Sequence, residues 1–231
     1  MRLYSIKEHK HGRRLIGALL VLAAVPGRAA ENLLEFNLGR GFPWSSIQAQ
    51  GSSERSGSRG TAWSADFLHR TAPYVAWGLG GGQFRSNDNV SQTFLANAIS
   101  TITSKTTSVL LLARTDVPSS STLTPYFIVG LGWVRNTLSV AAVPGATWTD
   151  TGTTESRPLL HDSKDTFGYA YGLGLDYALN DRLVVGIEAR YESSLKSTYN
   201  LTPAGSAVTG LNSIQSSLTL FTAGVKVGIK Y

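Results

Sequence analysis

The fold is decided by the stretch Phe167-Gly168-Tyr169-Ala170-Tyr171-Gly172-Leu173-Gly174-Leu175-Asp176-Tyr177-Ala178-Leu179. Its odd-numbered positions all carry large apolar side chains, whereas its even-numbered positions carry glycine, alanine or a single aspartate. Successive side chains of a β-strand point to opposite sides, so a period of two separates these residues onto two unlike faces. The segments 183–192 and 221–231 repeat the alternation, with apolar residues at the odd positions. The chain therefore contains long strands that are bulky on one side and small on the other.

The same alternation, weaker elsewhere, predicts eight strands in the chain. We expect them over residues 33–42, 60–69, 73–84, 105–115, 123–134, 166–178, 183–193 and 217–231. Most of these strands are longer than the ~5–6 residues typical of soluble sheets and reach the ~9–11 residues that a tilted strand needs to cross a bilayer. Strand length therefore favours a sheet that spans a membrane.

The connections between the strands give a second, independent indication. Three of them are short, at residues 70–72, 116–122 and around 180–182. The other four are long and rich in Ser, Thr, Asn and Gly, at residues 43–59, 85–104, 135–165 and 194–216. Short turns at one end and long polar loops at the other are typical of outer-membrane barrels, in which the long loops face outward.

Backbone hydrogen bonding explains why such a sheet must close. In hydrocarbon each unpaired N–H or C=O group costs several kcal/mol, so an all-β membrane protein has to be a closed barrel. At eight strands the interior is narrow enough for side chains to fill it, and the small face suits that bore. We therefore predict an all-β, eight-stranded antiparallel up-and-down transmembrane β-barrel with its bulky face against lipid.

A soluble eight-stranded barrel or a sandwich is the alternative, because its strands alternate as well. The composition of the faces argues against it. A water-facing side should be rich in Lys, Glu and Thr, whereas the small face here is rich in Gly and Ala, and only 16% of the residues are charged against a typical ~25%. Lipid against the bulky face fits these proportions better than water.

The few charges on the small face have matching signs. We expect them to form a lumen charge network of Asp176, Glu188, Arg190, Glu192, Lys226 and Lys230. Inside a narrow lumen they have to pair, because an isolated buried ion is very costly. The alternative function for the same residues is to line a pore or a proton path.

Tryptophan and tyrosine side chains fall near the predicted strand ends or at outward positions. We interpret them as an aromatic girdle at the membrane interface, made of Trp63, Trp77, Trp133, Tyr74, Tyr126, Tyr169, Tyr177, Tyr191 and Tyr231. Aromatic side chains gather at both membrane–water boundaries of outer-membrane barrels. A ligand-binding aromatic box is the less simple explanation.

The N-terminal segment has the layout of a signal peptide. A basic stretch ends at Arg13-Arg14, an apolar run covers residues 15–25, and Gly27 and Ala29 favour cleavage after Ala29. We therefore predict a signal peptide over residues 1–29 and a barrel domain over 30–231. A retained anchor helix is the alternative, but the apolar run is about half as long as the ~30 Å bilayer core requires.

Charge and cysteine content exclude several function classes. Residues 1–30 hold six basic residues against one acid, whereas residues 31–231 hold 15 against 14, a net charge of +1. A nearly neutral mature chain has no electrostatic footprint for DNA or RNA. Because the chain has no cysteine, it has no disulfide framework, no Cys-ligated zinc and no thiol nucleophile.

Taken together, the segments 32–42, 171–183 and 225–231 resemble the small OmpA-type, opacity-like outer-membrane β-barrels of Gram-negative bacteria. The resemblance implies an outer-membrane location, with outer-membrane lipid and lipopolysaccharide as surroundings. It also implies that the closing strand is an assembly signal recognised by the barrel-assembly machinery, carried by Val225, Val227, Ile229 and Tyr231. The family differs mainly in its loops, so the resemblance leaves the surface ligand open.

His161-Asp162-Ser163, predicted at a loop end before the sixth strand, is the one nucleophile-like cluster. It is similar to the His–Ser pair of lipid A deacylases, in which an acidic residue orients the histidine. The match is poor, because Asp165 and Asp176 have no secure placement as that acid. His69 is expected beside a turn without a partner, and no spacing of His, Asp or Glu predicts a metal site.

The sequence thus favours a non-enzymatic outer-membrane surface protein, with no catalytic, cofactor-binding or metal residues. Its expected role is in envelope integrity or in loop-mediated adhesion. The alternatives are a lipid A-modifying enzyme that uses Ser163 and His161, and a narrow channel for small solutes. Contact with nucleic acid is not expected.

Overall fold

The computed structural model describes residues 32–49, 52–56, 59–86, 91–94, 98–119, 121–142 and 158–231. The predicted signal peptide lies outside the described residues and stays a prediction. Within the described part of the chain, no helix has both the length and the apolar character needed to cross a membrane.

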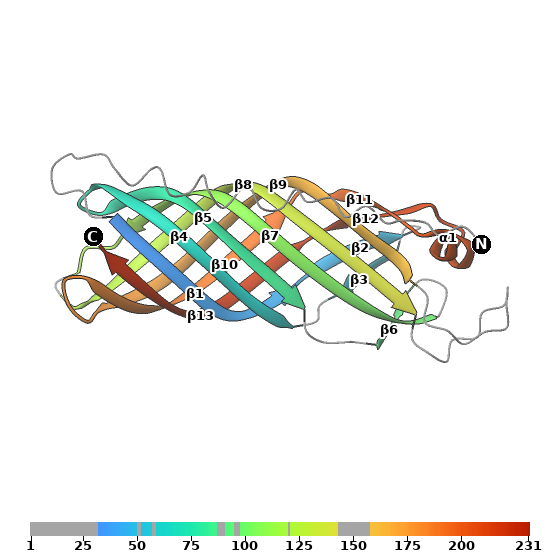
Figure 1. The fold of residues 1–231 in the computed structure, drawn as a ribbon, viewed down its shortest axis with the longest axis horizontal. Coiled ribbons are helices and arrows are strands. Elements are labelled where there is room, and N and C mark those ends of the chain that lie inside the picture. Colours follow the sequence, from blue (N-terminus) through green and yellow to red (C-terminus); the bar gives the residue numbers. More distant parts are fainter. Residues whose placement is uncertain are drawn as a thin grey trace, which may run out of the picture. The chain divides into compact units, whose positions relative to one another are not determined.

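Eight long antiparallel strands close into a barrel, as predicted (Figure 1). They are β1 (Asn32–Pro43), β4 (Gly60–Ala72), β5 (Val75–Ser86), β7 (Ala98–Asp116), β8 (Leu123–Ala142), β9 (Pro158–Ala178), β10 (Leu183–Ser194) and β13 (Thr219–Lys230). Each strand pairs with its neighbours in chain order, β13 pairs with β1, and every pairing is antiparallel. Closure leaves no free edge among these strands, which is what hydrocarbon requires of a sheet.

The predicted long loops are wrong in part, because several of them contain regular structure. β7, β8 and β9 are 19, 20 and 21 residues long and extend into the expected loops 85–104 and 135–165. The other regular elements of the expected loops are β2 (Ser45–Ala49), β3 (Ser52–Ser56), β6 (Ser91–Phe94), β11 (Ser197–Asn200), α1 (Pro203–Thr209) and β12 (Ser213–Ser217). Their Ser- and Thr-rich sequences lack an apolar period of two, so pattern reading missed them.

The large apolar side chains of the barrel strands point outward. Leu173 is 59% exposed and Leu131 is 57% exposed, although both lie inside long strands. The inward positions of the same strands are buried or half-buried, and they hold either small residues such as Gly130 and Ala170 or large ones such as Ile128. This arrangement is the reverse of a soluble barrel and matches the lipid-facing assignment of the bulky face.

We expect Leu173→Arg to lower the free energy of unfolding in a lipid bilayer by about 2–4 kcal/mol, because a charge near the bilayer centre is poorly solvated. Leu195→Arg is the matched control. Leu195 is 56% exposed, but it follows β10 at the end opposite the short turns, and the change there should stay within about 0.5 kcal/mol. Urea unfolding of the refolded variants in vesicles measures both values. Equal losses would contradict a lipid-facing Leu173.

Beyond the end of the barrel opposite the short turns, the chain forms a second folded region, which we call the extracellular head. It consists of the four-stranded sheet β11-β12-β2-β3, helix α1 and the adjoining ends of β7, β8 and β9. Its apolar core contains Ile102, Leu138, Val140, Leu159, Leu160, Tyr199 and Ile214. Thr202 caps α1 by accepting a hydrogen bond from Gly205 N at 3.0 Å and donates one to Pro158 O at 2.6 Å. The expected loops therefore form a packed structure.

Candidate functional site: the lumen charge network

Arg114 of β7 is buried in the barrel interior, near the short-turn end of its strand. Its guanidinium group donates to Glu35 Oε1 at 2.6 Å, to Asp116 Oδ1 at 2.7 Å and to Asp176 Oδ2 at 2.6 Å. These three carboxylates come from β1, β7 and β9, so one side chain links strands on different sides of the barrel. The Arg114 side chain is only 3% exposed, so its guanidinium group has lost its hydration. The charge-assisted hydrogen bonds to the three carboxylates compensate for that loss.

Lys226 of β13 shares two of these carboxylates. Its ammonium group donates to Glu35 Oε1 and forms an ion pair with Asp176 Oδ1 at 2.8 Å. Both cations also face the ring of Tyr126, with distances to the ring centroid of 3.8 Å for Arg114 and 4.0 Å for Lys226. An aromatic face attracts a cation most strongly where water is excluded. Tyr126 thus packs between two charges in the lumen.

A second cluster surrounds Arg190 of β10. Its Nη2 atom lies 2.5 Å from Asp66 Oδ2 and 2.8 Å from Glu188 Oε1. The hydroxyl group of Tyr126 donates to Glu188 Oε2 at 2.8 Å, so Tyr126 joins the Arg190 cluster to the Arg114 cluster. The interior therefore holds one connected network of charges built around an aromatic ring.

Glycine on the facing strand gives the Tyr126 ring its space. A Cβ atom placed on Gly174 would lie 2.2 Å from Cζ and from the hydroxyl oxygen of Tyr126, far inside contact distance. Gly174 is an even-numbered position of the stretch that decided the fold. The small face of that strand is therefore complementary to a large residue that projects from β8.

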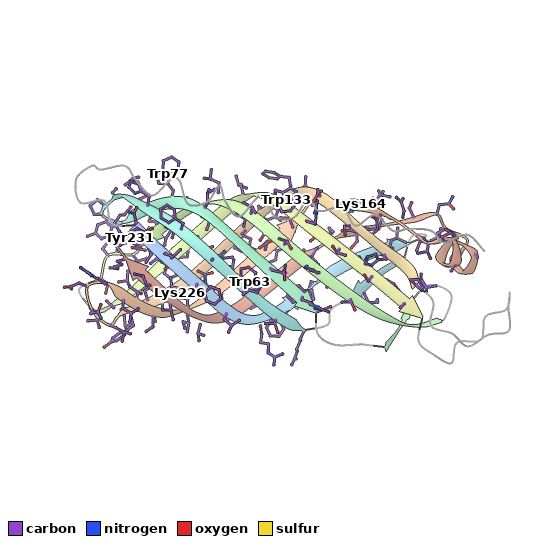
Figure 2. The ribbon with its side chains drawn as sticks, in the orientation of Figure 1. Trp63, Trp77, Trp133, Lys164, Lys226 and Tyr231 are labelled. Atoms are coloured by element: carbon purple, nitrogen blue, oxygen red, sulfur yellow. The ribbon has the colours of Figure 1, made fainter. Side chains whose placement is uncertain are left out.

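The predicted girdle position of Tyr126 is wrong, because the side chain is 1% exposed and lies inside. The position of Tyr126 in the sequence already indicates this, because it is even-numbered. The bulky outward residues of β8 are all odd-numbered, namely Phe127, Val129, Leu131 and Trp133. The other predicted girdle residues lie at outward positions and are at least partly exposed. Figure 2 shows Trp77 near the same end as Tyr231, with Trp63 and Trp133 farther along the barrel.

The structure brings four of the six predicted network residues together, namely Asp176, Glu188, Arg190 and Lys226. Glu192 lies on the same inward face and accepts a hydrogen bond from Ser108 Oγ at 3.3 Å. Lys230 lies at the short-turn end of β13 and is half-buried.

Sequence reasoning missed Glu35, Asp66, Arg70, Arg114 and Asp116, which the structure adds to the network. Each is an inward charged residue, but only Glu35 is the sole inward charge of its strand: Asp66 and Arg70 share β4, and Arg114 and Asp116 share β7. Glu35, for example, stands between the outward residues Leu34 and Phe36. A charged residue between two outward apolar residues of a strand therefore indicates a position in the lumen.

Three of these carboxylates could in principle hold a metal ion. One oxygen each of Glu35, Asp66 and Glu188 lie within 4.8 Å of one another. All three residues are already paired with buried cations, Glu35 with Arg114 and Lys226 and the other two with Arg190. The cluster therefore has its counter-charges within the chain.

Next to Arg190 lies an internal cavity of about 50 Å³. Polar residues on its wall include Asn37, Thr106, Ser108 and Glu192. A cavity of this size holds only a few water molecules at ~10–15 Å³ each, and unpartnered oxygens on Asn37, Thr106 and Glu192 offer them hydrogen bonds. The space is much smaller than the aqueous bore of a general porin.

The His161-Asp162-Ser163 segment does not have the geometry of a catalytic triad. It lies within β9 rather than at a loop end, so His161 and Ser163 share one face and Asp162 lies on the other. Ser163 Oγ is hydrogen-bonded to Thr137 Oγ1 at 2.8 Å, and His161 Nδ1 to Ser139 Oγ at 2.7 Å. Asp162 instead accepts hydrogen bonds from Asn200 N and Ser163 N. The acid thus does not orient the histidine.

The expectation that His69 has no partner is also wrong. Its Nδ1 atom is hydrogen-bonded to Asn32 Oδ1 at 2.9 Å, across the pairing of β4 with β1.

A closed eight-stranded barrel with short turns at one end and a bulky apolar exterior agrees with a known family model. The model, described as an outer membrane protein beta-barrel domain, matches residues 15–230. The chain belongs to this family. Its location is therefore the outer membrane, and the expected family resemblance is confirmed.

Several solved structures are similar to the chain at low sequence identity. Neisserial surface protein A is 13% identical, with 85% of this chain and 96% of that one covered and a TM-score of 0.46. OprG of Pseudomonas aeruginosa is 18% identical, with 88% and 96% covered and a TM-score of 0.47. The protease OmpT of Escherichia coli is 7% identical, with 90% and 99% covered and a TM-score of 0.49. No protein of curated function matches significantly.

The predicted assembly-signal residues lie at the outward positions of the closing strand. Val225, Val227, Ile229 and Tyr231 are 63%, 49%, 50% and 56% exposed. Their recognition by the assembly machinery stays a prediction.

Proposed function

We propose that this outer-membrane barrel is a non-enzymatic surface protein, and that its extracellular head makes the contacts that constitute its function. The head carries the proposal, because it is a packed region with its own apolar core rather than a set of open loops. Binding residues are commonly presented on connections that a rigid scaffold positions. The barrel provides that scaffold and the anchor in the membrane.

The interior of the barrel supports an anchor more than a conduit. Tyr126, Arg114 and Lys226 fill the lumen toward its short-turn end and are each 3% exposed or less. At the head end, inward residues of β7 and β8, such as Ile102 and Val140, belong to the apolar core of the head. A solute path along the axis would have to displace both layers.

The surface of β9 likewise favours binding over catalysis. His161 and Ser163 each pair with a hydroxyl group of β8, and the neighbouring carboxylate of Asp162 is directed to β11. Activation of a serine needs a base that is itself oriented by a third group. The described residues of this segment lack that arrangement.

Asp162 ties β11 to β9 within the head, which leads to a pH-dependent prediction. Partial burial would raise the pKa of Asp162, but hydrogen bonds from Asn200 N, Lys164 and Ser163 N outweigh it and hold the pKa below its usual value. A lowered folded-state pKa stabilises the fold at neutral pH, and this contribution is lost as the pH falls through that value. We expect the protection of β11 amides from exchange, relative to an unstructured peptide at the same pH, to fall in wild type at acidic pH, and to be lower in Asp162→Asn than in wild type already at pH 7. Unchanged exchange at Asn200 in the variant would contradict this tie.

The proposal is tested by removing β11, α1 and β12 from the head while leaving the barrel. Ser193 and Thr219 are paired neighbours on β10 and β13, so a short Gly-Asn-Gly turn can replace residues 195–218 and close a direct hairpin. Replacement of the opposite turn, residues 180–182, by Gly-Asn-Gly is the control. Both variants should reach the outer membrane and keep heat-dependent gel mobility.

Attachment of cells to polystyrene and to epithelial layers is then compared with that of a deletion strain. The hairpin variant should attach as poorly as the deletion strain, and the control as well as wild type. Full attachment by the hairpin variant would overturn the head as the contact surface. If deletion changes only detergent resistance, the role is envelope integrity, and if it changes lipid A acylation, the protein acts as an enzyme.

A further inference from the structure

Three cations form a continuous row on the lipid-facing side of the barrel. Arg40 of β1 pairs with Thr61 of β4, Thr61 pairs with Arg85 of β5, and Arg85 pairs with Lys105 of β7. All four residues occupy outward positions and are exposed. We call Arg40, Arg85 and Lys105 the outer cation row.

The row lies near the end of the apolar exterior on the side of the head. On β1, Arg40 follows the exposed outward residues Leu34, Phe36 and Leu38, and two exposed aromatic residues, Phe42 and Trp44, come after it. On β7, which runs in the opposite direction, Lys105 precedes the exposed Val109 and Leu111. The cations therefore sit at the boundary between acyl chains and headgroups on the outer surface.

The row has no counter-charge within the described chain. Among the ion pairs of the described residues, none includes Arg40, Arg85 or Lys105. Arg85 and Lys105 are directly opposite on adjacent strands, and like charges in that relation are destabilising. An anion that bridges them would relieve the repulsion.

A neighbouring cation shows the contrast. Arg135 of β8 also follows an outward aromatic residue, Trp133, but it forms two hydrogen bonds of 2.7 Å with Asp165. Among the described residues, Arg135 thus has a carboxylate partner, whereas the outer cation row has none and can accept an external anion. Guanidinium groups fit phosphate oxygens in a bidentate manner, and lysine adds a compact positive charge.

We propose that the outer cation row binds the phosphate groups of lipid A, the phosphorylated lipid of the outer leaflet. Arg85 and Lys105 hold one phosphate between β5 and β7, and Arg40 extends the positive surface across Thr61. The apolar residues below the row contact the acyl chains of the same lipid. This inference uses the outer-membrane location and is independent of the proposed role of the head.

The test is a titration of the mature, folded protein in detergent micelles with bisphosphorylated lipid A and with dephosphorylated lipid A. Each basic residue near a phosphorylated surface contributes roughly five-fold in affinity. Arg85→Gln should therefore weaken binding of the phosphorylated lipid about five-fold, and R85Q/K105Q about 25-fold. The charge-conserving variant R85K/K105R should retain binding within about two-fold of wild type, and Arg182→Gln, at the short-turn end, should leave it unchanged.

Heat-dependent gel mobility shows that each variant is folded before it is titrated. Equal affinity of wild type for the two lipids, or of R85Q/K105Q and wild type for the phosphorylated lipid, would overturn the proposal. Displacement of lipid A by an equal concentration of inorganic phosphate would also overturn it, since the site would then bind a free anion. If Arg182→Gln weakens binding as much as Arg85→Gln, the effect is one of net charge and the row is not a site.

Discussion

Replacement of Arg114 by methionine should lower the free energy of unfolding by about 3–5 kcal/mol. This loss is a large part of the stability of a typical domain, so most of the protein molecules should fail to fold. The substitution leaves the carboxylates of Glu35, Asp116 and Asp176 in the lumen without the cation that donates to all three. Lys226 and Arg70 compensate only in part, because they contact these acids from other sides. The readouts are the fraction with folded gel mobility after refolding and the urea midpoint in vesicles.

Arg135→Met is the control for Arg114→Met. Arg135 forms an equally short ion pair with Asp165, but its side chain is 51% exposed, so its loss should cost less than about 1 kcal/mol. The triple variant R114M/E35Q/D176N removes two of the stranded charges and should recover a measurable part of the folded fraction. A loss at Arg114 no larger than that at Arg135 would show that the lumen is well hydrated and that its ion pairs are weak.

We expect Tyr126→Ala to lower the free energy of unfolding by about 3–5 kcal/mol. Tyr126 is the side chain that packs against Arg114 and Lys226 and connects them to Glu188, so its removal leaves a gap beside Gly174. Water entering that gap would solvate the charges around it. Thermal unfolding should begin at a lower temperature, whereas planar-bilayer recordings should stay silent because the apolar core of the head still closes the path.

Tyr126→Phe separates the two contributions of the ring and the hydroxyl group. Phenylalanine keeps the ring between the cations and removes only the hydrogen bond to Glu188, which is worth about 1.5–3 kcal/mol as a bond to a charged group. This variant should remain silent in planar bilayers. Ion conductance by wild type would show that neither the ring nor the core of the head obstructs the lumen, and the channel alternative would then replace the anchor.

Whether a residue is odd- or even-numbered within its strand predicts, to a limited extent, whether it faces the lumen or the lipid. Parity within β9 and β10 placed Asp176, Glu188 and Arg190 inside, because a strand has only two faces and its bulky face was evident. The same rule applied to β8 would have placed Tyr126 inside, but the expectation of an aromatic girdle outweighed it. Glu35 was missed because it is the one inward charge on β1, and Arg114 was missed because β7 lacks the alternation of bulky and small residues that separates the faces of β9 and β10.

The extracellular head was beyond pattern reading for a different reason. β11, β12 and the outer part of β9 are rich in Ser, Thr and Asn, and they become regular structure only because they pair with one another and cover Leu159 and Leu160. A polar segment whose strand is stabilised by distant partners looks like a loop in the sequence. The predicted loop bounds were therefore wrong while the positions of the barrel strands were close.

The sequence by itself determined the properties that depend on neighbouring residues: a period of two, a bulky face for lipid, a small face for a narrow lumen, and hence a closed barrel in the outer membrane. The tertiary structure decided which residues meet. Arg114 and Glu35 are 79 residues apart, and Lys226 and Glu35 are 191 apart. Their encounter depends on the register of every intervening strand pair and on closure of the sheet. Local periodicity contains no information about register, so only the folded barrel reveals the network and the outer cation row.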